Sequence, residues 1–250
     1  AGLAEVIGFE PIAEECERLN ATSGFPESIR YLPYAIGDGA SHTLNITNLP
    51  MTSSLFEPDS ETLDLFHYLG EFTQVVGRER LQTRRLDDIA DLGPIDFMKL
   101  DIQGAELMAL QNATTVLATT SVIQCEVEFV ELYKGQPLFA DVDSFLRSQG
   151  FCFLRFAYTM GRPFKPMLTD GDPTRQICQT LWADAIYVKD FRLCHQWDDR
   201  ILQSAALVLH KFYGGYDLAR LLIQELDRRH GSDLVSDYLS FFLGIQKGNA

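Results

Sequence analysis

Strand-like and helix-like segments alternate along the first 190 residues, and this order limits the fold more than any other feature. Runs typical of strands lie at 5–11, 29–38, 96–101 and 121–132. Segments with the apolar spacing of helices lie at 12–24, 60–72, 104–117 and 139–151. Chains with this order usually build a mainly parallel sheet with helices on both faces. The sequence therefore predicts an α/β fold.

The remaining segments of this part predict smaller features. Residues 39–60 are rich in Thr, Ser, Asn and Pro, which favours a long loop or a short hairpin. Residues 78–89 indicate an edge strand that runs into a turn. Residues 151–158 and 182–190 form a pair of strand-like runs that would close the sheet.

The character of the chain changes after Asp190. Residues 198–213 carry one apolar helical face, Gly214 and Gly215 interrupt it, and two similar segments follow. We therefore predict a domain at 1–190 and a helical appendage at 191–250. The appendage either packs against the sheet domain or forms the surface of a homodimer.

The amino-acid composition limits which kinds of molecule the protein can bind. The chain has 35 acidic against 21 basic residues, a net charge of −14, which speaks against nucleic acid or an anionic membrane surface as the main partner. No apolar run approaches the roughly 20 residues needed to span a bilayer. The five cysteines are scattered without a CxxC, which favours a reducing compartment and a cytoplasmic location. The five histidines show no metal-ligand spacing, so we predict no metal, although the carboxylates of Asp101, Glu106 and Glu126 are of a ligand type that a metal accepts.

Acidic side chains follow three of the strand-like runs: Glu10, Asp38 and Asp101. Ligands of open α/β sheets bind outside the carboxyl ends of the strands. A carboxylate at such an end can accept both hydroxyls of a ribose. For Glu10 the alternative is a stabilising charge at the start of helix 12–20. The next strand carries Glu126 and Glu128, of which we expect one to face the cleft.

Four stretches resemble the FkbM-type methyltransferases in order and spacing. They read VIGFEPIAEECERLN (6–20), RRLDDI (84–89), DFMKLDIQGAELMALQNA (96–113) and VIQCEVEFVELYKGQPLF (122–139). The resemblance covers about residues 5–190. It implies a Rossmann-like fold and an S-adenosylmethionine-dependent enzyme that methylates a hydroxyl of a sugar, glycolipid or polyketide. It further implies that Glu10, followed by Pro11, binds the adenosyl ribose, that Asp38 lies near the adenine, and that Asp101 lies at the methionine end, facing the acceptor.

Physical chemistry gives these residues provisional roles. Asp101 is the first candidate to orient the acceptor hydroxyl and take its proton, and Glu126 is the second catalytic candidate. Glu106 braces the loop, holds the substrate or caps the helix that follows it. The loop at 48–58 is a candidate acceptor loop or a plain solvated loop, and its Ser53 and Ser54 offer hydroxyl groups.

The chain departs from the family pattern in two ways. Gln103 stands where the family usually has an acid, so a charge-dependent role there is in doubt. The glycine-rich first strand and turn of the family lie upstream of residue 1. In the strand order 3-2-1-4-5 that strand would separate run 5–10 from run 96–101, so we predict that these two runs are not directly hydrogen-bonded and that a longer protein supplies the strand.

Two other functions stay open on the sequence. A nicotinamide-dependent oxidoreductase would use Glu10 on a dinucleotide ribose equally well. A non-catalytic relative would keep the sheet as a binding or assembly module. The acceptor itself has no motif that we can interpret.

Overall fold

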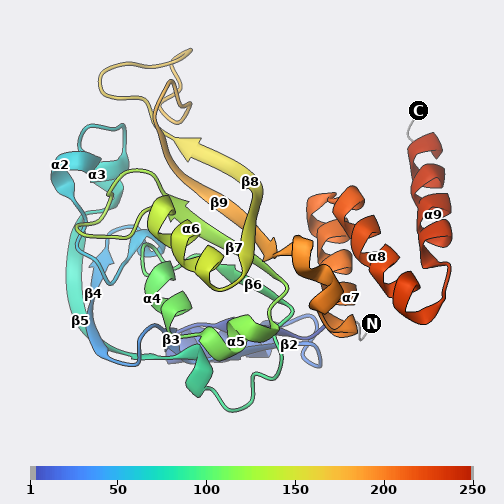
Figure 1. Ribbon diagram of the computed structural model, residues 1–250. Helices are drawn as coiled ribbons and strands as arrows, with labels where there is room; N and C mark the ends of the chain where they lie inside the picture. Colours follow the sequence, from blue (N-terminus) through green and yellow to red (C-terminus); the bar gives the residue numbers. More distant parts are fainter. Residues whose placement is uncertain (1–3, 249–250) are drawn as a thin grey trace.

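The computed structural model describes residues 4–248, with side chains through residue 241, as a mixed α/β protein (Figure 1). The strands are β1 (Val6–Phe9), β2 (Ile29–Leu32), β3 (Ala35–Ile36), β4 (Ser41–Thr47), β5 (Val75–Arg84), β6 (Phe97–Leu100), β7 (Val122–Glu128), β8 (Phe151–Gly161) and β9 (Thr180–Lys189). The α-helices are α1 (Ala13–Thr22), α2 (Ser60–Leu63), α3 (Leu69–Phe72), α4 (Glu106–Gln111), α5 (Thr114–Thr119), α6 (Phe139–Ser148), α7 (Asp199–Val208), α8 (Tyr216–His230) and α9 (Leu234–Gly248). A π-helical turn, Leu209–Tyr213, follows α7. Three short 3₁₀ turns lie at Pro50–Thr52, Leu86–Asp88 and Phe191–Gln196.

The strands form three sheets rather than one. β1 pairs with β2 in parallel, β5 lies between β3 and β4, and the largest sheet has the order β6-β7-β9-β8. In that sheet β6 and β7 are parallel, while β9 is antiparallel to both β7 and β8. The α/β class is thus confirmed, but the single, mainly parallel sheet is not observed. The closing pair is antiparallel because residues 162–179 join β8 to β9 without a crossover helix.

β1 and β6 belong to different sheets. Within residues 4–248, β1 pairs only with β2 and β6 only with β7. Direct hydrogen bonding between β1 and β6 would have contradicted the predicted upstream strand, and it is not observed. The upstream strand itself stays a prediction.

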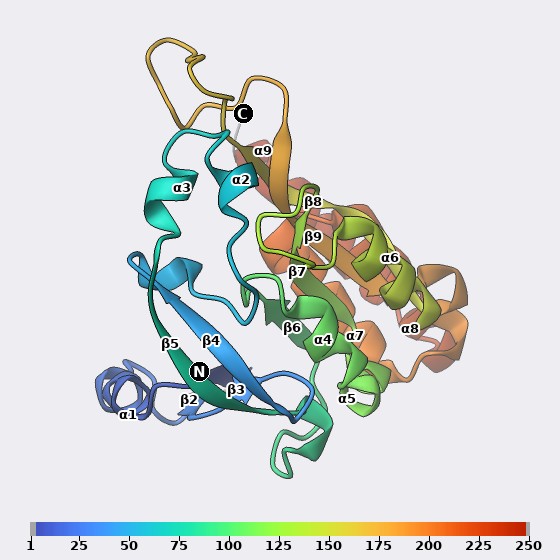
Figure 2. The ribbon, with the colours of Figure 1, turned by 90° about the vertical axis from the view of Figure 1, so that its left-hand side faces the viewer.

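Helices cover both faces of the four-stranded sheet, as predicted. One face packs against α4, α5 and α6 through a core that contains Leu110, Leu117 and Leu146. The other face packs against α7 and α8, where Val122 and Ile186 of the sheet meet Leu202. Figure 2 shows α4 and α6 on one side of the sheet and α7 on the other. The C-terminal helices therefore pack against the sheet domain, while the domain boundary at residue 190 stays a prediction.

The β1-β2 pair shares the first of these cores. Ile7, Phe9 and Leu32 are half-buried and pack against the cluster that also holds Met98 and Leu100 of β6. Side-chain packing thus joins two sheets that share no backbone hydrogen bonds.

Two segments carry more strand than their sequence indicated. The polar segment 39–60 contains β4, which pairs antiparallel with β5 over seven residue pairs. The run 29–38 splits into β2 and β3, which enter different sheets. β5 is flanked on both sides, so the edge position predicted for this strand is wrong. Alternating polar side chains make β4 look like a loop in the sequence, but two of them, Asn45 and Thr47, are buried and hydrogen-bonded to Ser54 O and Leu49 O.

Two predicted helices are each divided in two. Tyr68, with a φ of +66°, stands between α2 and α3 and ends any continuous helix there. Helix 104–117 ends first at Asn112, and α5 begins where Asp87 accepts hydrogen bonds from the backbone N–H groups of Thr115 and Val116, both at 3.0 Å. An anionic group satisfies free N–H groups at a helix start, so Asp87 of the RRLDDI stretch fixes the second helix.

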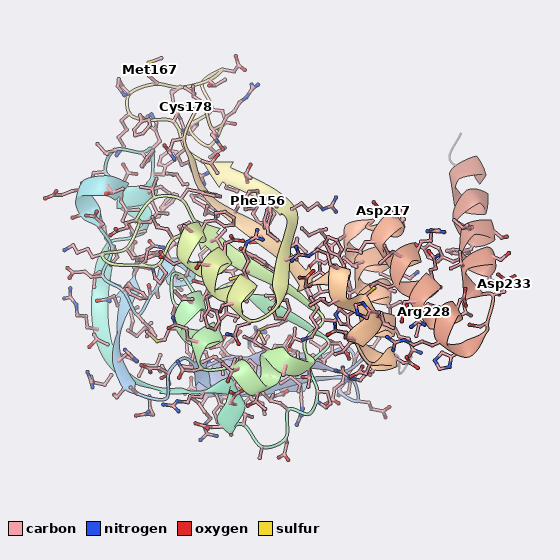
Figure 3. All side chains as sticks on the ribbon, in the orientation of Figure 1. Phe156, Met167, Cys178, Asp217, Arg228 and Asp233 are labelled. Atoms are coloured by element: carbon pink, nitrogen blue, oxygen red, sulfur yellow. The ribbon has the colours of Figure 1, made fainter. Side chains whose placement is uncertain are left out.

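A long connection between β8 and β9 projects from the end of the sheet (Figure 3, where Met167 and Cys178 mark it). It lies beside the α2-α3 segment, because Lys165 N donates to Leu65 O at 2.8 Å and the Phe66 and Phe164 rings are 4.6 Å apart. Within the described residues, no helix is both long and apolar enough to cross a membrane.

Candidate functional site

The loop after β6 has an unusual backbone. Gln103 has a φ of +55° and Gly104 a φ of +95°, both in the left-handed region. A non-glycine residue there is uncommon and costs about 1 kcal/mol or more, so it persists only where the surroundings hold it. Gly104 meets the same demand without a Cβ. The loop therefore turns sharply between Asp101 and α4, at the carboxyl end of β6.

Gln103 connects the acids of the site. Its Nε2 donates to Asp101 Oδ1 at 3.2 Å and to Glu126 Oε2 at 3.0 Å. Its Oε1 accepts from the Tyr133 hydroxyl at 3.2 Å, and its backbone oxygen accepts from Ser54 Oγ at 2.6 Å. These four contacts hold the left-handed residue and fix the positions of two carboxyl groups. The neutral amide of Gln103 can donate hydrogen bonds to both carboxyl groups. A third ionised acid at this position would instead repel them.

Asp101 is the ionised member of the pair. Its side chain is 41% exposed and its Oδ2 lies 2.9 Å from Lys99 Nζ. Partial burial alone would raise the pKa of Asp101, but the hydrogen bond and charge of Lys99, with hydrogen bonds from Glu126 and Gln103, hold that pKa below its ordinary value. At neutral pH the site thus presents one accessible carboxylate.

Glu126 is the protonated member. Burial first, and then the charges of Asp101, Glu128 and Glu106, raise the pKa of Glu126 to about 9. A protonated carboxyl group can donate to Asp101 while accepting from Gln103. Asp101 and Glu126 therefore share one proton at neutral pH, as two close carboxyl groups must when both cannot ionise.

Glu106 is buried behind the loop. Only 2% of the residue is exposed, and its Oε1 accepts from the Ile102 N–H at 2.6 Å. Burial raises the pKa of Glu106 to about 7 against the opposing effect of backbone N–H donors in the loop. This geometry favours the bracing role over direct contact with a substrate.

Glu126 and Glu128 lie on the same face of β7. Residues two apart in a strand point the same way, and β7 is regularly paired from Val122 to Glu128. The expectation that only one of the two faces the cleft is therefore wrong. Burial and the charge of Glu106 raise the pKa of Glu128 well above its ordinary value, so Glu128 belongs to the same acidic group.

A second set of polar residues continues along this face of the sheet. The buried Asp184 stands opposite Glu126 in β9 and accepts from the Tyr158 hydroxyl at 2.9 Å and from Gln124 Nε2. The Tyr213 hydroxyl of the π-helical turn donates to Gln124 Oε1 at 2.6 Å. Hydrogen bonds thus run from the C-terminal helices to the strand beside Glu126.

The predicted cofactor residues lie at the ends of the smaller sheets. Glu10 directly follows β1, and its Oε1 accepts from the Ile12 N–H at 2.9 Å, at the start of α1. Asp38 follows β3, and its Oδ1 accepts from Ala40 N and His42 Nε2, both at 2.8 Å. The hydrogen bond from His42 is the main reason that the pKa of Asp38 is lowered. Pro11 is exposed beside Glu10.

The two serines of the proposed acceptor loop differ. Ser54 is buried, donates to Gln103 O and accepts from Phe56 N at 3.0 Å, so it supports the turn after β6. Ser53 is half-buried, and its Oγ accepts from Thr47 N at 3.1 Å. Of the two, Ser53 is the one nearer to solvent.

Sequence reasoning missed three members of the site. Glu128 is not among the catalytic candidates from the sequence, although its two-residue spacing from Glu126 places it on the same face of the strand. Tyr133 and Gln136 sit in the segment after β7, where Gln136 Oε1 accepts from Leu132 N and Tyr133 N at 2.7 and 2.6 Å. No local pattern pointed to them, because their contacts with the β6 loop span some 30 residues of chain.

A comparison with protein-family models shows to which family the chain belongs. Residues 1–153 match the model of the methyltransferase FkbM domain. The chain belongs to the FkbM methyltransferase family. No curated protein and no solved structure matches the chain closely enough to add to this. The acidic group at the ends of β6 and β7 thus lies within the FkbM domain, and no group of three or more potential metal ligands is assembled among the described residues.

Proposed function

We propose that this FkbM methyltransferase is an S-adenosylmethionine-dependent O-methyltransferase whose acceptor is a hydroxyl of a sugar, glycolipid or polyketide-like compound. One observation supports this most: an accessible, ionised Asp101 is held beside a protonated Glu126 at the end of a parallel strand. Pairs of carboxyl groups with opposite protonation states are typical of sites that move protons. We propose a cytoplasmic location on the cysteine composition alone.

The chemistry of the residues at the strand ends fits the cofactor. Glu10 leaves Oε2, and Asp38 leaves Oδ2, without a hydrogen-bond partner among the described residues. Carboxylate oxygens accept from ribose hydroxyls and from an adenine amine. The accessible, ionised Asp101 suits a cationic sulfonium or amino group. When bound, S-adenosylmethionine would supply the electrophilic methyl group.

Asp101 needs only weak basicity for this role. The proton of an alcohol becomes strongly acidic as its oxygen forms a new bond to carbon, so a carboxylate with an ordinary or lowered pKa can accept it late in the reaction. Before that, Asp101 can orient the hydroxyl, and orientation supplies much of the rate enhancement in such transfers. Lys99 and Gln103 hold Asp101 through its two oxygens.

Glu126 and Glu106 act on Asp101 rather than on the acceptor. The protonated Glu126 donates to Asp101 and keeps its carboxylate in place. Glu106 braces the backbone of the loop from behind. Ser53 is the serine that we assign to acceptor contact, while Ser54 supports the loop.

The decisive experiment is calorimetric titration of S-adenosylmethionine into the full-length protein and into its Glu10→Ala variant. We expect saturable binding to the wild type, weakened in the variant by about 1.5–3 kcal/mol, the scale of hydrogen bonds to a charged group. Glu14→Ala, an exposed glutamate of α1, is the matched control and should bind as the wild type does.

Two results would contradict the proposal. Binding of a nicotinamide dinucleotide in place of S-adenosylmethionine would favour an oxidoreductase. Wild-type affinity in a folded Glu10→Ala protein would leave Glu10 with its helix-start role alone. Circular dichroism on each variant separates lost binding from lost folding.

A further inference from the structure

A cavity lies between α7, α8 and α9, away from the acidic group. Its volume is about 410 Å³, within the range of pockets that hold small molecules. The walls are mainly apolar, with Ala206, Leu207, Ile223 and Leu226 among the lining residues. These helices follow the residues matched by the family model, so the cavity is a separate feature of this chain. Figure 3 marks the start of α8 by Asp217 and the approach to α9 by Asp233.

Polar groups are few in the lining. They are Gln203, His210, Lys211 and the Tyr238 hydroxyl. His210 Nδ1 lies 3.0 Å from Tyr238 Oη, which leaves His210 Nε2 without a hydrogen-bond partner among the described residues. The rings of Tyr216, Tyr238 and Phe241 surround the imidazole at 5.0 to 6.2 Å between centroids.

The π-helical turn is the device that presents these groups. His210 and Lys211 both belong to Leu209–Tyr213, where the helix widens by one residue per turn. Turns of this kind are rare and recur at functional sites. Burial first, and then the neighbouring Lys211, lower the pKa of His210, so its ring is neutral at pH 7.

Charge identifies the occupant. Among the described lining residues, the exposed Lys211 is the only charged one and none carries a carboxylate, although acids outnumber bases 35 to 21 in the chain. Lys211 forms no ion pair with a described residue, whereas most arginines of α8 do. An apolar cavity with one unpaired cation complements a ligand with an apolar body and one negative charge.

We propose that this cavity binds an amphipathic small molecule, an aliphatic chain with a carboxylate head, whose head group lies at Lys211 and His210. The chain occupies the space between Ala206, Ile223 and Leu226. This site is independent of methyl transfer and of the cofactor.

The test compares decanoate with decanol, which share a chain and differ in the charge of the head. Each is titrated by calorimetry into the full chain, below its aggregation concentration. We expect one saturable site for decanoate. Lys211→Gln should weaken decanoate about tenfold, the scale of one charge-assisted hydrogen bond, and leave decanol unchanged. Lys134→Gln, which removes an exposed lysine of the sheet domain, should change neither.

Two further variants test the location. Ala206→Trp fills the cavity and should weaken both ligands at least tenfold. Leu207→Glu places a carboxylate on a half-exposed lining residue that tolerates substitution, and should weaken decanoate more than decanol. A folded Leu207→Glu protein keeps the proposal testable if Ala206→Trp does not fold.

The proposal is overturned if decanoate shows no saturable binding, or if binding ignores both Ala206→Trp and Leu207→Glu. It is also overturned if sedimentation shows a dimer that Leu207→Glu dissociates while decanoate does not bind. In that case a second copy of the chain fills the cavity.

Discussion

The acidic residues of the sheet domain and those of the C-terminal helices are stabilised in opposite ways. At the ends of β6 and β7, Asp101, Glu106, Glu126 and Glu128 are grouped with one lysine, and burial raises the pKa of three of them. In α8, Glu225 accepts hydrogen bonds from Arg228 at 2.7 Å and from Arg229 at 2.9 Å, which lower its pKa to about 2.

The difference separates a functional group of charges from a structural one. Carboxylates with arginine partners stabilise the folded state above their own pKa. Buried carboxyl groups without cations destabilise the ionised protein, and such an arrangement persists where function requires it. The left-handed backbone of Gln103 beside them is also unfavourable for stability, and such strain is common at functional sites. The contrast therefore supports the acidic group, and not the helices, as the site of chemistry.

The largest effect should come from Asp101→Asn, which keeps the size and removes the charge. Turnover should fall about 100- to 10,000-fold, the range of general base catalysis, while affinity for S-adenosylmethionine changes little. The measurement is formation of S-adenosylhomocysteine with an acceptor found by screening hydroxyl compounds against the wild type. Asp64→Asn, in the loop after α2, is the control. Near-normal turnover would limit Asp101 to support of the loop.

The next effect is on stability, and it depends on pH. Glu126 has an ordinary pKa of 4.5 when unfolded and one of about 9 when folded. The folded state therefore holds a proton that the unfolded state releases above pH 4.5, and the free energy of unfolding must fall as pH rises towards 9. In Glu126→Gln the side-chain amide can still donate to Asp101 and accept from Gln103, but it has no group that titrates. It should be neutral near pH 5 and stabilising by about 1–3 kcal/mol at pH 9.

Urea denaturation at several pH values measures this effect. Glu79→Gln, an exposed glutamate of β5, should leave the pH dependence as it is in the wild type. If Glu126→Gln leaves the slope of stability against pH unchanged, Glu126 is ionised in the folded protein and the shared proton is excluded.

The sequence predicted this site in part because its main residues are local to strand ends. Lys99, Asp101 and the following turn lie in one stretch, so the strand boundary alone placed Asp101 at the carboxyl edge. The same reasoning placed Glu10 after β1 and gave α1 and α6 close to their observed limits. Regular apolar spacing sufficed for these elements because each buries one face.

The rest depended on contacts between distant residues. Tyr133 and Ser54 meet at Gln103 from segments 30 and 49 residues away, and nothing in either segment indicates this. Those partners hold Gln103 in its left-handed conformation. Because the residue is not a glycine, the sequence gives no sign of a positive φ at this position. The strands are divided among three sheets because particular strand edges pair with one another. The apolar pattern of a strand says little about which strand it will pair with.

Glu225→Gln should show the opposite pH dependence to Glu126→Gln. Because arginine partners lower the folded pKa of Glu225 to about 2, its contribution is present above pH 4.5 and is lost as pH falls through about 2. The variant should lower the melting temperature slightly at pH 7 and approach that of the wild type as pH falls below about 2. Glu61→Gln, in α2, provides the control for loss of a surface charge. A variant more stable than the wild type at pH 7 would remove the contrast between the two regions.

The smallest effect concerns the hydrogen bond that joins the regions. Tyr213→Phe removes the hydroxyl that donates to Gln124 Oε1 and leaves that oxygen without its partner beside Asp184. Loss of one such bond costs about 0.5–1.5 kcal/mol, to be measured by urea denaturation. Because Asp184 keeps Tyr158 as a donor, the β7-β9 pair beside Glu126 should stay in place and turnover should change less than twofold. Tyr216→Phe, at the start of α8, tests whether any lost tyrosine hydroxyl in the helices has this effect. If turnover falls more than twofold in a Tyr213→Phe protein that is still folded, the C-terminal helices control the acidic group through β7. The two regions would then act as one.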